Sequence, residues 1–218
     1  MKKCGKKILI TGILLICAFA LWSVLIQTID VQNVGVNGTA VGFATLNSYV
    51  HSLTGVNMTL YNITDWLGLV PVAVCMIFGL VGFVQLIKRK SFLKVDRDII
   101  FLGIYYVIVT GSYLIFEMIP INYRPILING FMEVSYPSST TLLVLSVMPT
   151  LIFQNNRRIQ NKSIRKVINV VSVLFAVFMV TGRLVSGVHW FTDIVGSVFL
   201  SAGLFYVYKG IVLICDEK

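Results

Sequence analysis

Charged residues are scarce in this sequence, and several long stretches of the chain contain none. Only 12% of the 218 residues are Asp, Glu, Lys or Arg, whereas 57% are hydrophobic. A soluble domain of this size does not need so much apolar surface, so the composition excludes an ordinary water-soluble globular protein. The class that fits is an all-α, polytopic membrane protein.

Cysteine is also rare, and its spacing excludes several kinds of site. The four cysteines do not have the spacing of a metal site, a redox motif or a disulfide framework. Cys17 and Cys75 lie inside apolar stretches, and Cys4 and Cys215 lie near the ends of the chain. These positions are typical of small hydrophobic side chains.

Acidic residues are few, and the basic residues that outnumber them gather beside the apolar stretches. Nine Asp and Glu stand against eighteen Lys and Arg, which gives a formal net charge of +9. In a soluble protein this balance would suggest nucleic-acid binding. Here the basic flanks are typical of topology signals and of contact with anionic lipid headgroups, so we expect a membrane partner and no nucleic acid.

Six apolar stretches predict transmembrane helices. About 20 residues of helix cross a hydrocarbon core roughly 30 Å thick. The expected spans cover residues 8–26, 66–87, 99–119, 138–153, 167–181 and 190–208; the fourth is short and contains Pro149. We expect two parts. Residues 1–65 form an N-terminal helix and an outer loop, in which 43–60 could form an interfacial helix. Residues 66–218 form a five-helix core.

The first stretch has a second interpretation, a cleaved signal peptide. Ala18-Phe19-Ala20 resembles a cleavage site. The apolar run continues beyond it to Ile26, which favours a retained transmembrane helix.

The basic residues predict the orientation of the spans. With six spans, sixteen of the eighteen Lys and Arg lie on one side of the membrane. The positive-inside rule makes that side cytoplasmic, with both termini. Only Arg124 and Arg183 lie on the other side. Since a charged side chain costs roughly 2.5–3.5 kcal/mol at the bilayer centre, ionisable groups near spans usually have a function.

The predicted topology brings a set of polar residues to the outer face, where their chemistry suits a phosphate. Arginine offers paired donors to phosphate oxygens, a helix N-terminus adds partial positive charge, and an imidazole can attack phosphorus. An aspartate four residues after the histidine would share its face of a helix and hold its other ring nitrogen. The residues of this set are Arg124, Ser138, Ser139, Arg183, His189 and Asp193.

The motifs around these residues resemble a known family. Arg183, His189 and Asp193 form R-x5-H-x3-D, preceded by P-S-x-x at 137–140 and by Arg124-Pro125. In this order they resemble the type-2 phosphatidic acid phosphatase superfamily, which includes membrane lipid phosphatases, undecaprenyl-diphosphate phosphatases, soluble acid phosphatases and vanadium haloperoxidases. The resemblance covers roughly residues 60–210 and implies the helical core of the membrane members.

The resemblance also implies a role for each residue. His189 would be the nucleophile that forms a phosphohistidine, and Asp193 would orient it. Phosphate would be bound by Arg124, Arg183, Ser138 and the backbone around Ser139. Since the arginines supply the positive charge, no metal or other cofactor is expected.

Four positions depart from the family pattern, one of them mildly: Gly182 stands where the family has a serine before the arginine of the third motif. Glu117 replaces a lysine, Ser139 replaces a glycine, and Thr140 replaces the histidine that protonates the leaving oxygen. A threonine hydroxyl is not an acid near pH 7. We therefore expect either an easier leaving group, as in a diphosphate, or a substitute donor such as Glu117 or Glu133, with His51 a weaker candidate. For Glu117 itself, pairing with an arginine is the favoured interpretation and the role of an acid the alternative.

Three functions remain open. The first is a phosphatase that hydrolyses a lipid phosphate or polyprenyl diphosphate at the extracytoplasmic face of the cell membrane. The second is a catalytically impaired family member that binds phospholipid or polyprenyl phosphate headgroups. The third is a lipid phosphotransferase.

Overall fold

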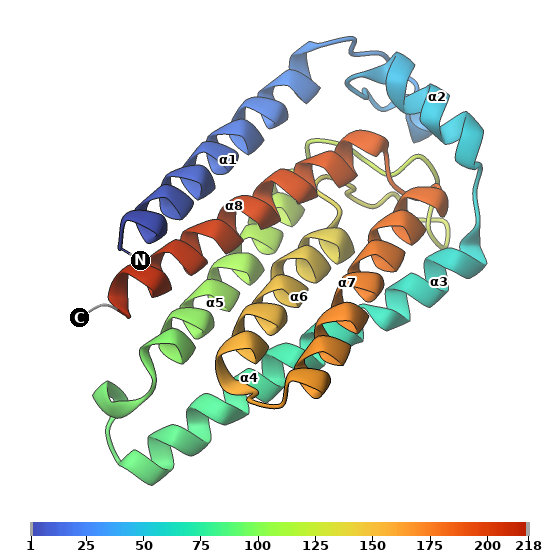
Figure 1. Cartoon of the computed structure of the whole chain (residues 1–218). Coiled ribbons are helices and arrows are strands. Elements are labelled where there is room, and N and C mark those ends of the chain that lie inside the picture. Colours follow the sequence, from blue (N-terminus) through green and yellow to red (C-terminus); the bar gives the residue numbers. More distant parts are fainter. Residues whose placement is uncertain (1, 217–218) are drawn as a thin grey trace.

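The computed structural model describes residues 2–216 and folds them into a bundle of long α-helices (Figure 1). The long helices are α1 (Lys2–Thr28), α4 (Leu69–Arg89), α5 (Arg97–Met118), α6 (Ser139–Arg158), α7 (Lys162–Val185) and α8 (Phe191–Cys215). Two shorter helices, α2 (Ala44–Thr54) and α3 (Met58–Leu67), and two 3-10 turns, Val36–Gly38 and Phe92–Lys94, lie between them. The all-α fold class is confirmed.

By length and composition, one helix fewer than predicted qualifies as a span. Over the described residues, five helical segments are long and apolar enough to cross a membrane, and α6 is not among them. Figure 1 shows α6 in the middle of the bundle, where it packs against α4, α5, α7 and α8. A helix enclosed by other helices need not be apolar. Its buried residues accordingly include Ser146, Thr150, Gln154 and Asn155. It also continues through Pro149 and is longer than the predicted 138–153.

The outer loop contains more helix than expected. In place of one interfacial helix over 43–60, α2 and α3 are separated by Gly55, whose φ of 61° lies in the left-handed region. The side chain of Asn57 caps α3 by accepting a hydrogen bond of 2.9 Å from the Leu60 amide. Because α3 packs against α7 and leads directly into α4, this loop contributes to the outer end of the bundle.

Helix α1 packs along α8 through glycines on both helices (Figure 1). A Cβ atom at Gly12 would lie 2.6 Å from the Val207 nitrogen, and one at Gly203 would lie 2.8 Å from Cγ1 of Ile16. Larger side chains at these glycines would therefore push the two backbones apart. This close approach makes α1 an integral part of the described fold.

The two ends of the bundle differ in what they carry. Both ends of the described chain and the α4–α5 and α6–α7 connections lie at one end, and residues 119–138 with the α7–α8 turn lie at the other (Figure 1). The basic flanks predicted from the sequence therefore gather at one end, which we call the basic end.

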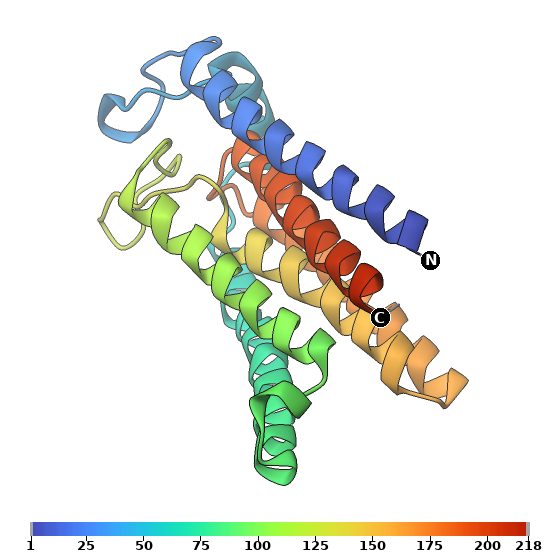
Figure 2. The same ribbon diagram turned by 90° about the vertical axis from the view of Figure 1, so that its left-hand side faces the viewer.

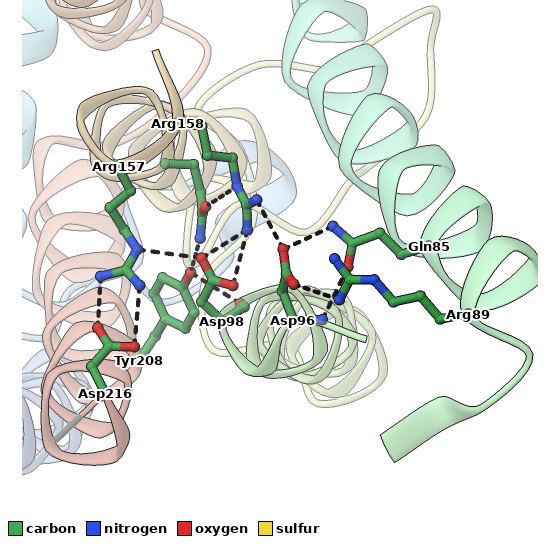
Figure 3. A network of polar contacts seen from close by, with 9 residues as sticks. Gln85, Arg89, Asp96, Asp98, Arg157, Arg158, Tyr208 and Asp216 are labelled. Carbon is green, nitrogen blue, oxygen red and sulfur yellow. Dashed lines mark hydrogen bonds and ion pairs between the residues drawn. The ribbon is translucent and has the colours of Figure 1, made fainter. Parts of the chain in front are cut away.

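A polar network ties the helices together at the basic end (Figure 3). Asp98 is buried in the first turn of α5 and accepts hydrogen bonds from Arg157 Nε at 3.3 Å and Arg158 Nη2 at 2.8 Å. Asp96 accepts one from Arg89 of α4 at 2.7 Å and one from Arg158 at 3.1 Å. The network therefore fixes α4, α5 and α6 at this end.

Candidate active site

His189 lies in the short turn between α7 and α8, at the end of the bundle opposite the basic end. The turn depends on Gly187, whose φ of 66° is in the left-handed region and where a Cβ would lie 1.7 Å from the Gly55 carbonyl oxygen. The spacing had predicted that His189 and Asp193 share one face of a helix. This prediction is wrong, because His189 lies before the start of α8. Asp193 lies in the first turn of α8, and the chain turns back to bring His189 to it.

The hydrogen bonds of His189 define its tautomer. The side chain is only 3% exposed. Nδ1 lies 3.1 Å from the carbonyl oxygen of Ser135 and 3.6 Å from Oδ2 of Asp193. A carbonyl oxygen only accepts, so Nδ1 carries the hydrogen and Nε2 keeps its lone pair. Nε2 has no hydrogen-bond partner within residues 2–216 and is the nitrogen that can act as a nucleophile.

The surroundings also keep His189 neutral. Burial lowers the pKa of His189 to about 4; the contact with Asp193 opposes this shift, and the positive charges of Arg124 and Arg183 reinforce it. At neutral pH the imidazole therefore has an available lone pair.

Asp193 is fully buried and has more than one contact. Its Oδ2 accepts a hydrogen bond of 2.9 Å from the Trp190 amide, which caps α8, and its Oδ1 accepts one of 3.3 Å from Nδ2 of Asn122. The carboxylate therefore positions the start of α8 as well as the imidazole.

The two outer arginines converge on one aromatic ring. Arg183 is 1% exposed and Arg124 is 8% exposed. The guanidinium carbons lie 4.8 Å and 5.5 Å from the centroid of the Tyr61 ring, respectively. The ring of Tyr61, which belongs to α3, therefore supports both cations through cation–π contacts.

The hydrogen-bond donors of these arginines are only partly used. Arg183 donates to Thr64 Oγ1 at 3.4 Å and to Asp65 Oδ1 at 3.5 Å, and Arg124 Nε lies 3.1 Å from Oε2 of Glu133. Nε of Arg183 and both Nε and Nη1 of Arg124 are buried without a hydrogen-bond partner in the described part of the chain, so the Arg124–Glu133 contact is an ion pair only. Buried donors without partners are costly, and a phosphate that bridges the two guanidiniums would satisfy them.

The two serines at the start of α6 have different surroundings. Ser138 is fully buried, its Oγ donates to Thr141 Oγ1 at 3.1 Å, and its carbonyl oxygen accepts from Ser197 Oγ at 2.9 Å. Its hydroxyl is thus engaged within the protein. Ser139, the first residue of α6, lines a cavity that also reaches His189.

This cavity, of about 240 Å³, brings together Arg124, Ser139 and His189 of the predicted site, whereas Ser138, Arg183 and Asp193 are not among its lining residues. We call it the phosphate cavity. Its polar lining comes from Glu117, Arg124, Glu133, Ser135, Ser139 and His189. Arg183 is linked to these residues by the Tyr61 ring, which both Arg183 and Arg124 contact.

The positions that depart from the family pattern are placed unexpectedly. Thr140 does not line the phosphate cavity; it lines a neighbouring cavity of about 340 Å³ together with Gly68 and Val72. Glu117 is exposed and lines the phosphate cavity, but within residues 2–216 it has no ion pair, so the expected pairing with an arginine is absent there. Arg124 pairs with Glu133 instead.

His51 lies outside the phosphate cavity. Its ring centroid lies 5.6 Å from that of Trp190.

Sequence reasoning missed the contribution of α3. Tyr61, Thr64 and Asp65 surround Arg183, and Asn122 holds Asp193. Asp65 carried a usable signal, because it is a lone acidic residue at the edge of an apolar stretch on the outer side. Tyr61 resembled an ordinary loop aromatic and carried no such signal.

A family profile described as the PAP2 superfamily matches residues 72–214. The chain belongs to the PAP2 superfamily. This confirms the resemblance that the three motifs indicated. A search of curated proteins gave no match.

Among solved structures, this PAP2 chain resembles a transmembrane PAP2-type phosphatidylglycerolphosphate phosphatase from Bacillus subtilis. The TM-score is 0.63 at 18% sequence identity, over 94% of this chain and 96% of that one. The similarity therefore extends to α1–α3, which the family profile does not cover. The fold is that of a multi-pass membrane phosphatase.

Proposed function

We propose that this PAP2 protein hydrolyses a lipid phosphate, and preferably a polyprenyl diphosphate, through a phosphohistidine at His189. One observation carries the proposal: a neutral His189, whose Nε2 has no hydrogen-bond partner among residues 2–216, lines the same cavity as Arg124, and Arg183 contacts the same Tyr61 ring as Arg124. Nε2 would attack phosphorus, and the two arginines would stabilise the charge on its oxygens.

An apolar groove between α4 and α5, nearer the basic end, supports a lipid substrate. Figure 2 shows α4 inclined to the other long helices, and between α4 and α5 lies a cavity of about 600 Å³, which we call the chain groove. Its lining is almost entirely apolar and includes Phe78, Phe83, Leu86, Ile99 and Leu102. The cavity that Thr140 lines also lies between α4 and α5, and it shares Tyr113, Ser139 and Leu142 with the phosphate cavity. A hydrocarbon chain would follow this path along α4 and α5.

The ease with which the leaving group departs indicates whether the site suits a phosphate monoester or a diphosphate substrate. Expelling an alkoxide, comparable to water with a pKa of about 15.7, requires an acid. Expelling a phosphate monoester, whose second pKa is about 6, requires none. Since Thr140 is neither an acid nor part of the phosphate cavity, the site suits a diphosphate better.

The distribution of charge supports an extracytoplasmic site. Sixteen of the eighteen Lys and Arg residues belong to the side predicted as cytoplasmic, and the described connections on that side lie at the basic end. The positive-inside rule then puts both termini in the cytoplasm and the phosphate cavity outside.

A panel of substrates tests the function. The detergent-purified chain is incubated with phosphatidic acid, phosphatidylglycerol phosphate, and mono- and diphosphates of farnesol and undecaprenol, and released phosphate is measured. We expect release that is fastest with the diphosphates and absent in His189→Gln, with His51→Gln as the matched control.

The departures at Thr140 and Glu117 also favour a second candidate, a member that binds headgroups without turnover. Binding of the phosphorylated lipids without phosphate release by the wild type would support this candidate and contradict the phosphatase. Transfer of label to an added alcohol in place of water would indicate a phosphotransferase.

A further inference from the structure

Glu117 is a carboxylate of the phosphate cavity with no described charge partner. It lies at the end of α5, is exposed, and lines the same cavity as His189 and Arg124. The other carboxylate of the cavity, Glu133, is held 3.1 Å from Nε of Arg124. Among the ion pairs of residues 2–216, none involves Glu117.

Glu117 and His189 reach the cavity from different elements, α5 and the α7–α8 turn. Figures 1 and 2 both show α6 between α5 and α7, and α6 packs against both of them. Glu117 belongs to the last turn of α5, His189 follows α7, and Ser139 at the start of α6 also lines the cavity.

This placement matters because phosphoryl transfer proceeds in line. The group that attacks phosphorus and the group that leaves lie on opposite sides of it. In the second half of the reaction His189 is the leaving group, so the attacking water must arrive from the side away from His189. Glu117 lines the cavity from α5 and not from the α7–α8 turn that carries His189.

The second half-reaction also requires a proton acceptor. A water molecule that attacks the phosphohistidine must lose a proton, and the residue at the family's acid–base position, Thr140, lines a different cavity. A carboxylate that only repelled the phosphate would weaken binding. One that accepts the proton of the water serves a step for which the cavity otherwise offers only Glu133, whose carboxylate is paired with Arg124.

We propose that Glu117 is the general base that hydrolyses the phosphohistidine. The oxygen of the water forms a bond to phosphorus, the bond from phosphorus to Nε2 of His189 breaks, and its electron pair returns to Nε2. The proton of the water passes to the Glu117 carboxylate and then to bulk water as phosphate leaves. This proposal rests on the proposed phosphatase function.

The test traps the intermediate. Wild type and Glu117→Gln, which keeps the shape of the side chain but cannot accept the proton, are mixed with a prenyl diphosphate labelled in its terminal phosphate, and both label on the protein and released phosphate are followed. We expect Glu117→Gln to accumulate close to one acid-labile phosphate per chain while turnover falls about 10²–10⁴-fold, the usual range for a lost acid–base group.

Two further variants separate the role of Glu117 from a general electrostatic effect. Glu117→Asp keeps a carboxylate and is expected to restore part of the turnover and to remove the label. Glu133→Gln, which alters the partner of Arg124, is expected to change KM without accumulation of label.

The outcomes that overturn the proposal are distinct from failure of the function. The role of Glu117 is overturned if Glu117→Gln turns over like the wild type, or if it loses turnover without accumulating label. Neither result contradicts the phosphatase function. A wild type that releases no phosphate and takes up no label overturns both.

Discussion

Nδ1 of His189 lies 3.1 Å from the carbonyl oxygen of Ser135, closer than the 3.6 Å that separates it from Oδ2 of Asp193. The carbonyl of Ser135 is therefore the hydrogen-bond acceptor of this N–H group, and the carboxylate of Asp193 lies just beyond hydrogen-bonding distance. The motif in the sequence pointed to Asp193 alone as the residue that orients the ring. Ser135 adds a backbone acceptor from the segment before α6, and no side-chain substitution removes it.

The first prediction concerns Asp193→Asn. Because the carbonyl of Ser135 still fixes the tautomer of His189, we expect phosphate release to fall about 10²-fold, less than the roughly 10⁴-fold known where a lone aspartate fixes it. Steady-state phosphate release, with thermal unfolding measured in parallel, checks this. A loss as complete as in His189→Gln would show that Ser135 does not maintain the tautomer.

The second prediction concerns the titration of His189, whose pKa burial lowers to about 4. The ring stays neutral as the pH falls through 6.5, the usual pKa of histidine, and takes up a proton only near pH 4. The nucleophile should therefore persist across the weakly acidic range. NMR of the ¹⁵N-labelled histidines measures this, with His51→Gln to assign the two signals. A midpoint near 6.5 for His189 would contradict it.

The third prediction concerns Tyr61, whose ring contacts both arginines. A cation–π contact is worth about 0.5–2 kcal/mol, and 1.4 kcal/mol corresponds to a factor of ten. We expect Tyr61→Ala to weaken competitive inhibition by inorganic phosphate or vanadate about tenfold or more. Tyr61→Phe, which keeps the ring, is the control and should retain inhibition. Equal effects in both variants would assign the role to the hydroxyl instead.

The sequence predicted the membrane class and the main motifs because both depend on local patterns. Apolar length identifies a span exposed to lipid, and the spacing of Arg183, His189 and Asp193 identifies a family. The same reasoning placed α6 among the spans although it is enclosed by its neighbours and carries Gln154 and Asn155 inside the bundle. Its polarity reflects tertiary packing, which hydropathy cannot reveal.

The unpredicted part of the site depends on contacts between distant segments. Tyr61 and Asp65 reach Arg183 only because α3 packs against α7, more than a hundred positions along the chain. Thr140 is next to Ser139 in sequence, yet the α-helix turns it into another cavity. The division of the chain near residue 65 and the roles of the site residues remain predictions.

The fourth prediction concerns the basic end, where Asp98 joins Arg157 and Arg158 (Figure 3). In Asp98→Asn the guanidiniums of Arg157 and Arg158 lose the negative charge of the buried carboxylate with which they pair. Since both arginines are partly exposed, we expect a loss of about 1–3 kcal/mol in the free energy of unfolding. Turnover per folded molecule should stay unchanged, because the phosphate cavity lies at the other end of the bundle.

Asp216→Asn is the matched control for Asp98→Asn. Asp216 is more exposed and pairs with Arg157 only, at 2.7 Å, among the described residues. Its substitution should therefore cost less than 1 kcal/mol, as is usual for exposed pairs. Thermal unfolding in detergent measures both variants, and an equal cost in the two would contradict a special role for Asp98.

The fifth prediction concerns two glycines that keep the chain groove open. Gly79 of α4 and Gly103 of α5 line it, and a Cβ added at either one meets no neighbouring atom within 4 Å in the described part of the chain. Gly79→Leu and Gly103→Leu should therefore fold, because their side chains enter empty space. The added side chain would occupy the path of the hydrocarbon, so kcat/KM should fall for undecaprenyl diphosphate and much less for farnesyl diphosphate.

Gly111→Leu provides the matched control for the groove. Gly111 also belongs to α5 and leaves an added Cβ without a neighbour within 4 Å among the described residues, but it does not line the groove. The same increase in size there should leave the ratio of the two substrates unchanged. If Gly79→Leu and Gly103→Leu reduce kcat/KM equally for both chain lengths, the groove does not hold the chain. The substrate would then be recognised through its phosphates alone, by the cavity that Arg124 and His189 share.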